Sequence, residues 1–187
     1  MIGWILLGIT VFVLAWVIIT FNKLVSLRNN VRNAWRQIDV QLKRRHDLIP
    51  NLVSTVKGAM EFEQDTLERV ISARAKAVSA QNNYDRGEAE NMLTQAIGKL
   101  FAVMENYPDL KSHGNVSQLQ EELTSTENRI GFARQFYNDL VANYRIEQEI
   151  FPNNVIVPML GGFEKEEYFQ AEDTDRAVPN ADISIRD

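Results

Sequence analysis

The sequence contains no cysteine and only two histidines. Without cysteine the chain cannot form disulfides, bind zinc through thiolates or use a thiolate nucleophile. It also cannot carry the lipid of a bacterial lipoprotein, because that lipid is attached to a cysteine. These absences remove several classes of enzyme, metal protein and lipid-anchored protein before any motif is considered.

Familiar motifs of catalysis and metal binding are also missing. No Gly-x-Ser-x-Gly turn and no glycine-rich phosphate loop occurs. A di-iron centre in a helical bundle needs Glu-x-x-His, but Lys43 precedes His46 and Leu110 precedes His113 at that spacing. Asp109 and His113 lie in a region bounded by proline and glycine, where a surface pair is the simpler interpretation. We therefore expect no enzyme activity, no bound metal and no cofactor.

Charged side chains are absent from residues 1–22, which read MIGWILLGITVFVLAWVIITFN. About 20 apolar residues are enough for a helix to cross a hydrocarbon core of roughly 30 Å. Trp4 and Trp16 lie toward the two ends, where membrane interfaces favour them. A cleaved signal peptide is the alternative, but it needs a basic start and a small-residue cleavage site. We predict a retained transmembrane anchor over residues 1–22.

Positive charge is concentrated directly after this span. Residues 23–45 carry seven cations and one acid, so residues 46–187 must carry a net charge of −11 to reach the −5 of the whole chain. Cations beside a span stay on the cytoplasmic side. We therefore expect a single-pass protein of the inner (cytoplasmic) membrane, with a short N-terminus outside and the folded domain in the cytoplasm.

The first cations form a neck at the expected membrane interface, comprising Lys23, Arg28, Arg32 and Arg36. They either serve only to orient the span, which is the simpler interpretation, or also contact lipid headgroups. A basic neck on an acidic body argues against a nucleic-acid partner, which needs a basic face on the folded domain.

An apolar stripe with helical spacing follows and continues through Pro50. Arg45 is its one interruption, and its members are Leu24, Leu27, Val31, Ala34, Ile38, Leu42, Ile49, Leu52, Val56 and Met60. A proline inside a helix removes a backbone hydrogen bond and clashes with the carbonyl four residues earlier. The helix therefore either kinks at Pro50 or stops near Asp47 and restarts. The unbroken phase of the stripe favours the kink.

Three further helical stretches are expected, over about residues 63–80, 88–105 and 117–149. The segments between them, QNNYDRGE and NYPDLKSHGN, are rich in turn-forming residues. The predicted inward positions include Ile71, Val78 and Met92. Because helices joined by short polar turns pack antiparallel, we predict an all-α protein. Its transmembrane helix continues into an antiparallel up-and-down four-helix bundle over residues 23–149.

The C-terminal region departs from this pattern. Residues 150–170 contain two prolines, a Gly-Gly pair and many large apolar side chains, which predicts an irregular apolar segment. This segment either packs back on the bundle, the simpler interpretation, or contacts a membrane, another protein or another subunit. Residues 171–187 are polar and acidic, and we expect a flexible tail there.

One group of polar residues is a candidate site. It combines an arginine of the second stretch with five residues of the fourth, and comprises Arg74, Asn128, Arg129, Arg134, Tyr137 and Asn138. Arg134 and Asn138 are about one turn apart and share a helix face. The group is either a recognition surface for a partner or small polar ligand, or a satisfied polar network that fixes helix register. The network is the simpler interpretation.

Several motifs together give the chain a family resemblance. In order along the sequence they are RRHDLIPNLVSTVKG, TLERVISARAKA, NYPDLKS, LQEELTSTENRIGFARQFYN, FPNNVI and GGFEKEEYF. In this order, and over most of the chain, they resemble the bacterial LemA family. The resemblance implies a membrane-anchored antiparallel four-helix bundle in the cell envelope, encoded near membrane metallopeptidases. The family has no established catalytic activity that the resemblance could carry over to this chain.

These observations predict a non-catalytic scaffold or adaptor of the cell envelope. Its expected partners are membrane lipid, further copies of itself in a homo-oligomer, and other membrane proteins such as membrane metallopeptidases. A membrane-linked sensor or ligand-binding module is the alternative. An enzyme or metal carrier is a remote third hypothesis.

Overall fold

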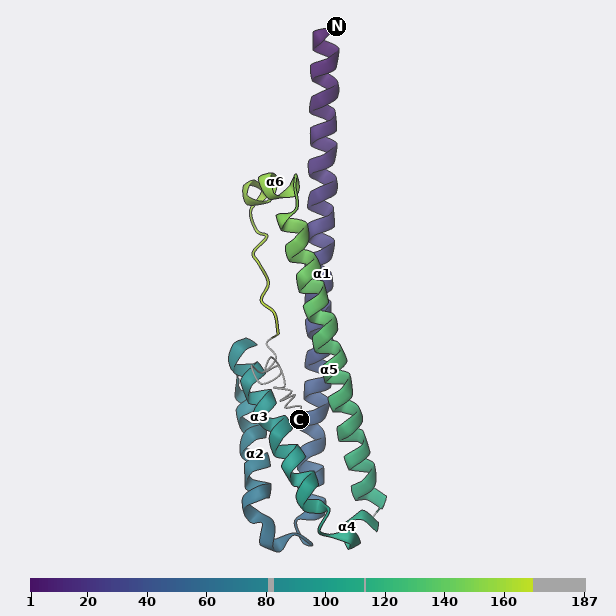
Figure 1. Ribbon diagram of the computed structural model, residues 1–187, viewed down its shortest axis with the longest axis vertical. Helices are drawn as coiled ribbons and strands as arrows, with labels where there is room; N and C mark the ends of the chain where they lie inside the picture. The colour runs from purple at the N-terminus through teal and green to yellow at the C-terminus, as the bar shows by residue number, and fades with distance from the viewer. Residues whose placement is uncertain (81–82, 113, 170–187) are drawn as a thin grey trace, which may run out of the picture. The chain divides into compact units, whose positions relative to one another are not determined.

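The computed structural model describes residues 1–80, 83–112 and 114–169 (Figure 1). These residues form α-helices and one short 3-10 helix, and no strand occurs among them. The elements are α1 (Ile2–Val56), η1 (Glu61–Glu63), α2 (Gln64–Ser79), α3 (Asn83–Met104), α4 (Pro108–Ser112), α5 (Gly114–Glu149) and α6 (Asn153–Leu160). The predicted all-α class is confirmed.

The chain divides into two compact units. Among the described residues, unit 1 comprises residues 1–45 and 124–168, and unit 2 comprises Phe169 and those between 46 and 123. The helices α1 and α5 each contribute to both units. Unit 2 is therefore built mainly from the chain between the two long helices, together with one end of each.

Helix α1 is a single helix of 55 residues with Pro50 inside it. The interpretation in which the helix stops near Asp47 and restarts is therefore wrong, and the helix that continues through Pro50 is confirmed. The proline itself is exposed, while Ile49 and Leu52 beside it are buried. The stripe thus keeps its phase because the proline ring lies on the solvent side of the helix.

The N-terminal part of α1 has the length and composition of a membrane span. Most of its large side chains from Ile2 to Ile19 are exposed, and none is part of the protein's buried core, although Trp16 and Val17 are half-buried. A helix of about 20 residues extends roughly 30 Å, the thickness of a hydrocarbon core. The sequence and the structure therefore both indicate membrane anchoring.

Unit 2 is organised around one apolar core. Its members come from the end of α1, from α2, α3 and α4, and from the first turns of α5. They are Ile49, Leu52, Val53, Val56, Met60, Leu67, Val70, Ala73, Ala77, Ala89, Leu93, Ile97, Leu100, Met104, Leu110, Val116 and Leu123. Helices α2 and α3 pack side by side within this unit.

Three predicted inward positions are wrong: Ile71, Val78 and Met92 are exposed. The buried residues of α2 follow one narrow line, at Leu67, Val70, Ala73 and Ala77. A residue that directly precedes or follows a buried residue is rotated from it by about 100° around the helix axis. Ile71 and Val78 each directly follow a buried residue, and Met92 directly precedes the buried Leu93, so all three point away from the core.

Two predicted turns contain helix. Helix α3 begins at Asn83, inside the segment QNNYDRGE, and α4 occupies residues 108–112 of the second segment. Gly87 is buried in α3, and the ring of Phe169 lies over it. Packing of this kind offsets the low helix propensity of glycine, which costs only about 1 kcal/mol relative to alanine.

Unit 1 pairs the first part of α1 with α5. Both helices bury apolar residues at helical spacing, and the rings of Trp35 and Tyr137 meet edge to face with centroids 5.2 Å apart. The buried members of the two stripes are Leu24, Val31, Ala34, Ile38 and Leu42 on α1, and Ile130, Tyr137, Val141 and Tyr144 on α5.

The C-terminal segment is irregular only in part. Residues 153–160 form α6, which the sequence prediction of an irregular segment missed. Residues 161–169 have no regular secondary structure, and Gly161 and Gly162 both take positive φ, which glycine adopts without strain. The tail from residue 170 lies outside the described residues.

We expect Leu93→Ala to lower the free energy of unfolding by about 2–5 kcal/mol, because it leaves a cavity in the core of unit 2. Met92→Ala, one residue away, should change it by no more than about 0.5 kcal/mol. The measurement is denaturant unfolding of the full chain in lipid nanodiscs, followed by helical circular dichroism. Equal losses for the two variants would contradict the placement of α3.

Candidate functional site

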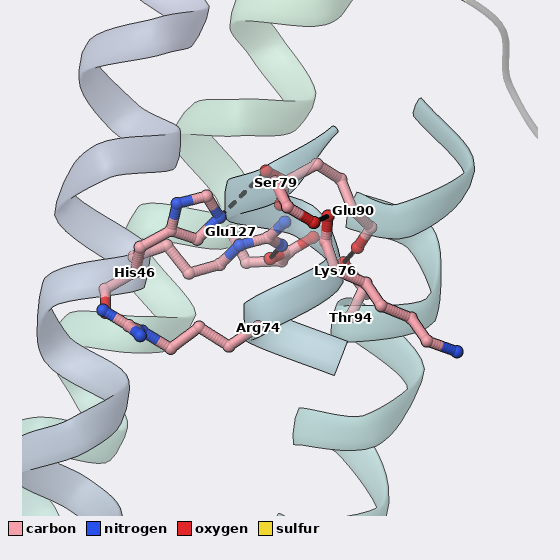
Figure 2. A network of polar contacts seen from close by, with 8 residues as sticks. His46, Arg74, Lys76, Ser79, Glu90, Thr94 and Glu127 are labelled. Carbon is pink, nitrogen blue, oxygen red and sulfur yellow. Dashed lines mark hydrogen bonds and ion pairs between the residues drawn. The ribbon is translucent and has the colours of Figure 1, made fainter. Parts of the chain in front are cut away.

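A polar pair joins α1 and α3 inside unit 2. Nε2 of His46 lies 2.9 Å from Oε1 of Glu90, and Glu90 is fully buried. The two side chains face each other in Figure 2. Such a contact is attractive when one of the two groups carries a proton for the other to accept. The pair therefore links the two helices at one defined register.

Pro50 leaves a backbone acceptor of α1 without its usual donor. Because proline has no N–H, the carbonyl four residues earlier, that of His46, receives no helical hydrogen bond from it. Arg74 of α2 supplies the missing donor, since its Nε donates to the His46 carbonyl oxygen at 2.7 Å (Figure 2). The guanidinium thus allows α1 to continue through the proline without an unsatisfied carbonyl.

Arg45, the interruption in the apolar stripe, is completely buried in unit 1. Its guanidinium forms an ion pair with the carboxylate of Glu127 on α5. A buried charge is stable only where a partner offsets its lost hydration. Arg45 and His46 are consecutive residues of α1, and each meets a carboxylate within its own unit. Neither pairing could be read from the sequence.

The structure separates the six residues of the predicted polar group. Arg74 lies in unit 2, where it bonds to His46, and the other five lie on α5 in unit 1. Asn128 and Arg129 are exposed, whereas Arg134 and Asn138 are half-buried and have interaction partners. Tyr137 is buried and donates its hydroxyl to the carbonyl oxygen of Glu167 at 2.8 Å.

Burial, together with the nearby carboxylates of Glu166 and Glu167, raises the pKa of Tyr137 to about 12, while the Arg145 guanidinium acts in the opposite direction. The hydroxyl therefore keeps its proton, and its hydrogen bond to Glu167, throughout the neutral pH range. Tyr137 acts in this position as a structural donor that ties the C-terminal segment to α5.

Arg145 also holds the C-terminal segment against α5. Its Nε donates to the Glu166 carbonyl oxygen at 2.8 Å, and its guanidinium lies 4.5 Å from the ring centroid of Tyr168. Lys165 of this segment forms an ion pair with Glu149, which lowers the pKa of that carboxyl. Residues 165–168 therefore contact α5 of the same chain.

The four neck cations have different surroundings. Lys23 pairs with Glu147 at 2.7 Å. Arg28 donates to the Gly162 carbonyl oxygen at 2.8 Å, and its guanidinium lies 5.3 Å from the ring centroid of Phe163. Arg32 and Arg36 are exposed. Half of the neck thus contributes to the structure of unit 1 as well as to the charge beside the span.

An open groove of ≈ 520 Å³ is formed by α1 and α5 in unit 1. Val40, Phe132 and Phe136 line it and are 63%, 73% and 49% exposed. Arg36 and Arg129 line it as well. Sequence reasoning identified the two arginines but missed the apolar residues. The sequence signal that could have revealed them is a pair of phenylalanines, Phe132 and Phe136, which lie four residues apart on α5 and outside its buried stripe.

Among the described residues, no cluster of three or more histidine and carboxylate side chains could hold a metal ion. His113, which the sequence pairs with Asp109, lies outside the described residues.

A comparison with protein families identifies the family of this chain. A family model described as "LemA family" matches residues 34–182. The chain belongs to the LemA family. The match begins within the part of α1 that follows the anchor and extends through α6, so it covers both units.

Individual relatives of this LemA-family chain are distant in sequence. Magnetosome protein MamQ 2 of Paramagnetospirillum magneticum is 25% identical over 190 residues, covering 88% of this chain and 69% of the relative. Magnetosome protein MamQ of Magnetospirillum gryphiswaldense is 24% identical, covering 80% and 64%. Protein LemA of Metamycoplasma hominis is 24% identical over 156 residues, covering 83% and 71%.

We expect Arg74→Met to lower the free energy of unfolding by about 1–3 kcal/mol, because it leaves the buried His46 carbonyl without a donor. In a Pro50→Ala background the same substitution should cost much less, since alanine restores the helical N–H. A double-mutant cycle in denaturant measures this coupling.

Arg69→Met is the matched control, because Arg69 is an exposed arginine of the same helix. It should have little effect in either background. Equal costs of Arg74→Met with proline and with alanine at position 50 would contradict the role assigned to the guanidinium.

Proposed function

We propose that this protein is a non-catalytic, membrane-anchored scaffold or adaptor of the cell envelope that acts by self-assembly. The observation that carries the proposal is the groove of unit 1, which presents exposed apolar side chains on a part of the protein that follows the membrane span. Exposed apolar surface flanked by polar groups is typical of protein interaction sites. Other membrane proteins, including membrane metallopeptidases, are further candidate partners.

The composition of the groove favours a protein partner. Phe132 and Phe136 offer large aromatic surfaces, and Arg36 and Arg129 stand beside them. Aromatic residues and arginine are the types most enriched at the centres of protein interfaces. The groove is also open rather than enclosed, which suits a side chain or helix of a partner better than a small molecule.

Charge complementarity supports a second copy as that partner. The groove contributes two arginines, whereas residues 46–187 carry a net charge of −11. An acidic surface from another copy would complement the arginines and speed association. Anchoring in the same membrane adds to this effect by raising the effective concentration of the copies.

The named relatives are compatible with a structural role. Two of them are named as magnetosome proteins and one as protein LemA. A role in building or organising a cell structure requires surfaces for association and no catalytic group. Such a role fits the groove, the anchor and the absence of familiar catalytic motifs from the sequence.

The proposed topology places the N-terminus outside the inner (cytoplasmic) membrane and both units in the cytoplasm. Its support is the run of cations at Lys23, Arg28, Arg32 and Arg36, with no cation in residues 1–22 other than the chain terminus. Cationic residues beside a membrane span are generally retained on the cytoplasmic side, and this rule places both units there in the proposal.

We expect the full chain, extracted in its native lipid, to form a discrete homo-oligomer, and Phe132→Glu to reduce the particle mass toward that of a monomer. The added carboxylate would be desolvated in the interface, which disfavours association. Mass photometry or native mass spectrometry of the extracted particle measures this change. Phe62→Glu is the matched control, because Phe62 is 94% exposed on η1 and outside the groove.

A monomeric wild-type particle at every protein-to-lipid ratio would rule out self-assembly. An oligomer unaffected by Phe132→Glu would show that the copies associate through another surface. If the protein is monomeric but its groove residues are needed in the cell, the ligand-binding alternative becomes the better hypothesis.

We expect a fluorescent reporter at the C-terminus to fold in the cytoplasm and an alkaline phosphatase reporter there to stay inactive. The reason is retention of the basic neck on the cytoplasmic side. Replacing the exposed neck cations Arg32 and Arg36 by glutamine should increase the fraction of inverted chains. A phosphatase fusion that is active in the wild type would disprove the topology.

A further inference from the structure

The chain from Ile150 to Phe163 contains no charged side chain, and α6 forms most of it. Phe151, Val155 and Met159 are 81%, 58% and 82% exposed. They are spaced four residues apart, so they line one side of the helix and its preceding turn. Asn153 and Val157 on the helix are buried. This short element of unit 1 therefore presents an exposed apolar face.

Two contacts place α6 at one end of the membrane span. The hydroxyl of Thr20 donates to Oδ1 of Asn153 at 3.3 Å, and both residues are buried. The rings of Phe21 and Phe163 meet edge to face with centroids 5.4 Å apart. Thr20 and Phe21 are among the last residues before the first cation of the neck. A span that begins at Ile2 would reach the edge of the hydrocarbon core at this level.

The orientation of α6 also suits a membrane surface. Figure 1 shows α6 lying crosswise to α1, at the end of unit 1 from which the anchor emerges. A helix that crosses the span direction at the level of the interface lies along the membrane plane. Amphipathic helices in this position bury one apolar face at the boundary of headgroups and acyl chains.

We propose that α6 is a membrane-lying helix that inserts Phe151, Val155 and Met159 among the lipids beside the anchor. The occupant of this face is lipid because the span itself brings the bilayer to the level of Thr20. A helix of two turns is too short to bind a membrane strongly by itself, but here the anchor holds it at the surface. The inference does not rest on self-assembly.

The absence of charge in this segment predicts how it recognises lipid. Peripheral helices that bind anionic lipids do so with lysine and arginine on their polar face, and α6 has neither. Insertion of α6 should therefore depend on apolar contact alone. It should be the same in zwitterionic and anionic membranes and should not respond to salt.

The natural absence of cysteine makes a direct test possible. Full-length Val155→Cys and Met159→Cys variants, each labelled with an environment-sensitive fluorophore, are reconstituted into phosphatidylcholine vesicles. The vesicles contain lipids spin-labelled near the top of the acyl chain. Val78→Cys is the matched control, because Val78 on α2 is 57% exposed against 58% for Val155.

Labels at positions 155 and 159 should show blue-shifted emission and at least about threefold stronger quenching by the spin-labelled lipid than the label at position 78. Phosphatidylglycerol or added salt should leave the quenching unchanged. Circular dichroism confirms that each labelled chain keeps its helix content, and two independent positions guard against a local disturbance at either one.

Three results would overturn the inference. Quenching at both positions by aqueous iodide, but not by lipid, would show that the face is in water. Protection from both quenchers would show that protein covers it. Quenching that appears only with anionic lipid and disappears in salt would assign the attachment to charged residues outside α6.

Discussion

The continuity of α1 depends on one hydrogen bond, from the guanidinium of Arg74 to the carbonyl oxygen of His46. Pro50 removes the backbone donor that this carbonyl would otherwise receive. Because a side chain from α2 replaces it, the helix continues to Val56 and contributes to both units. The bond therefore allows one helix to supply buried residues to the cores of both units, from Leu24 to Val56.

Polar groups buried beside this bond specify how the helices align. Arg45 pairs with Glu127 in unit 1, and His46 pairs with Glu90 in unit 2. Pairs of this kind often add little net stability, because desolvation offsets much of their attraction. Their contribution is specificity: a shift of α1 by one residue would leave two buried charged or polar groups without partners. Apolar stripes alone tolerate such shifts more easily.

The helical class, the anchor and the apolar stripes could be predicted because they depend on local spacing along the sequence. The stripe from Leu24 to Met60 even indicated one helix through Pro50. The exposed position of Met92 and the helical turn at Gly87 could not be predicted, since both are decided by packing against distant residues. For the same reason the partner of Arg74 could not be predicted, since it is a backbone carbonyl that no side-chain pattern reveals. The groove was missed because spacing along the sequence does not distinguish exposed apolar residues of a long helix from buried ones.

The pairing of Arg45 with Glu127 spans 82 residues of sequence, and this separation constrains the order of events during synthesis. The first half of α1 leaves the ribosome, and its anchor can enter the membrane, well before the matching half of α5 exists. Every residue of unit 2 up to Leu123 is translated in that interval. The apolar stripe from Leu24 to Leu42 is therefore synthesised well before the apolar stripe of α5 that buries it.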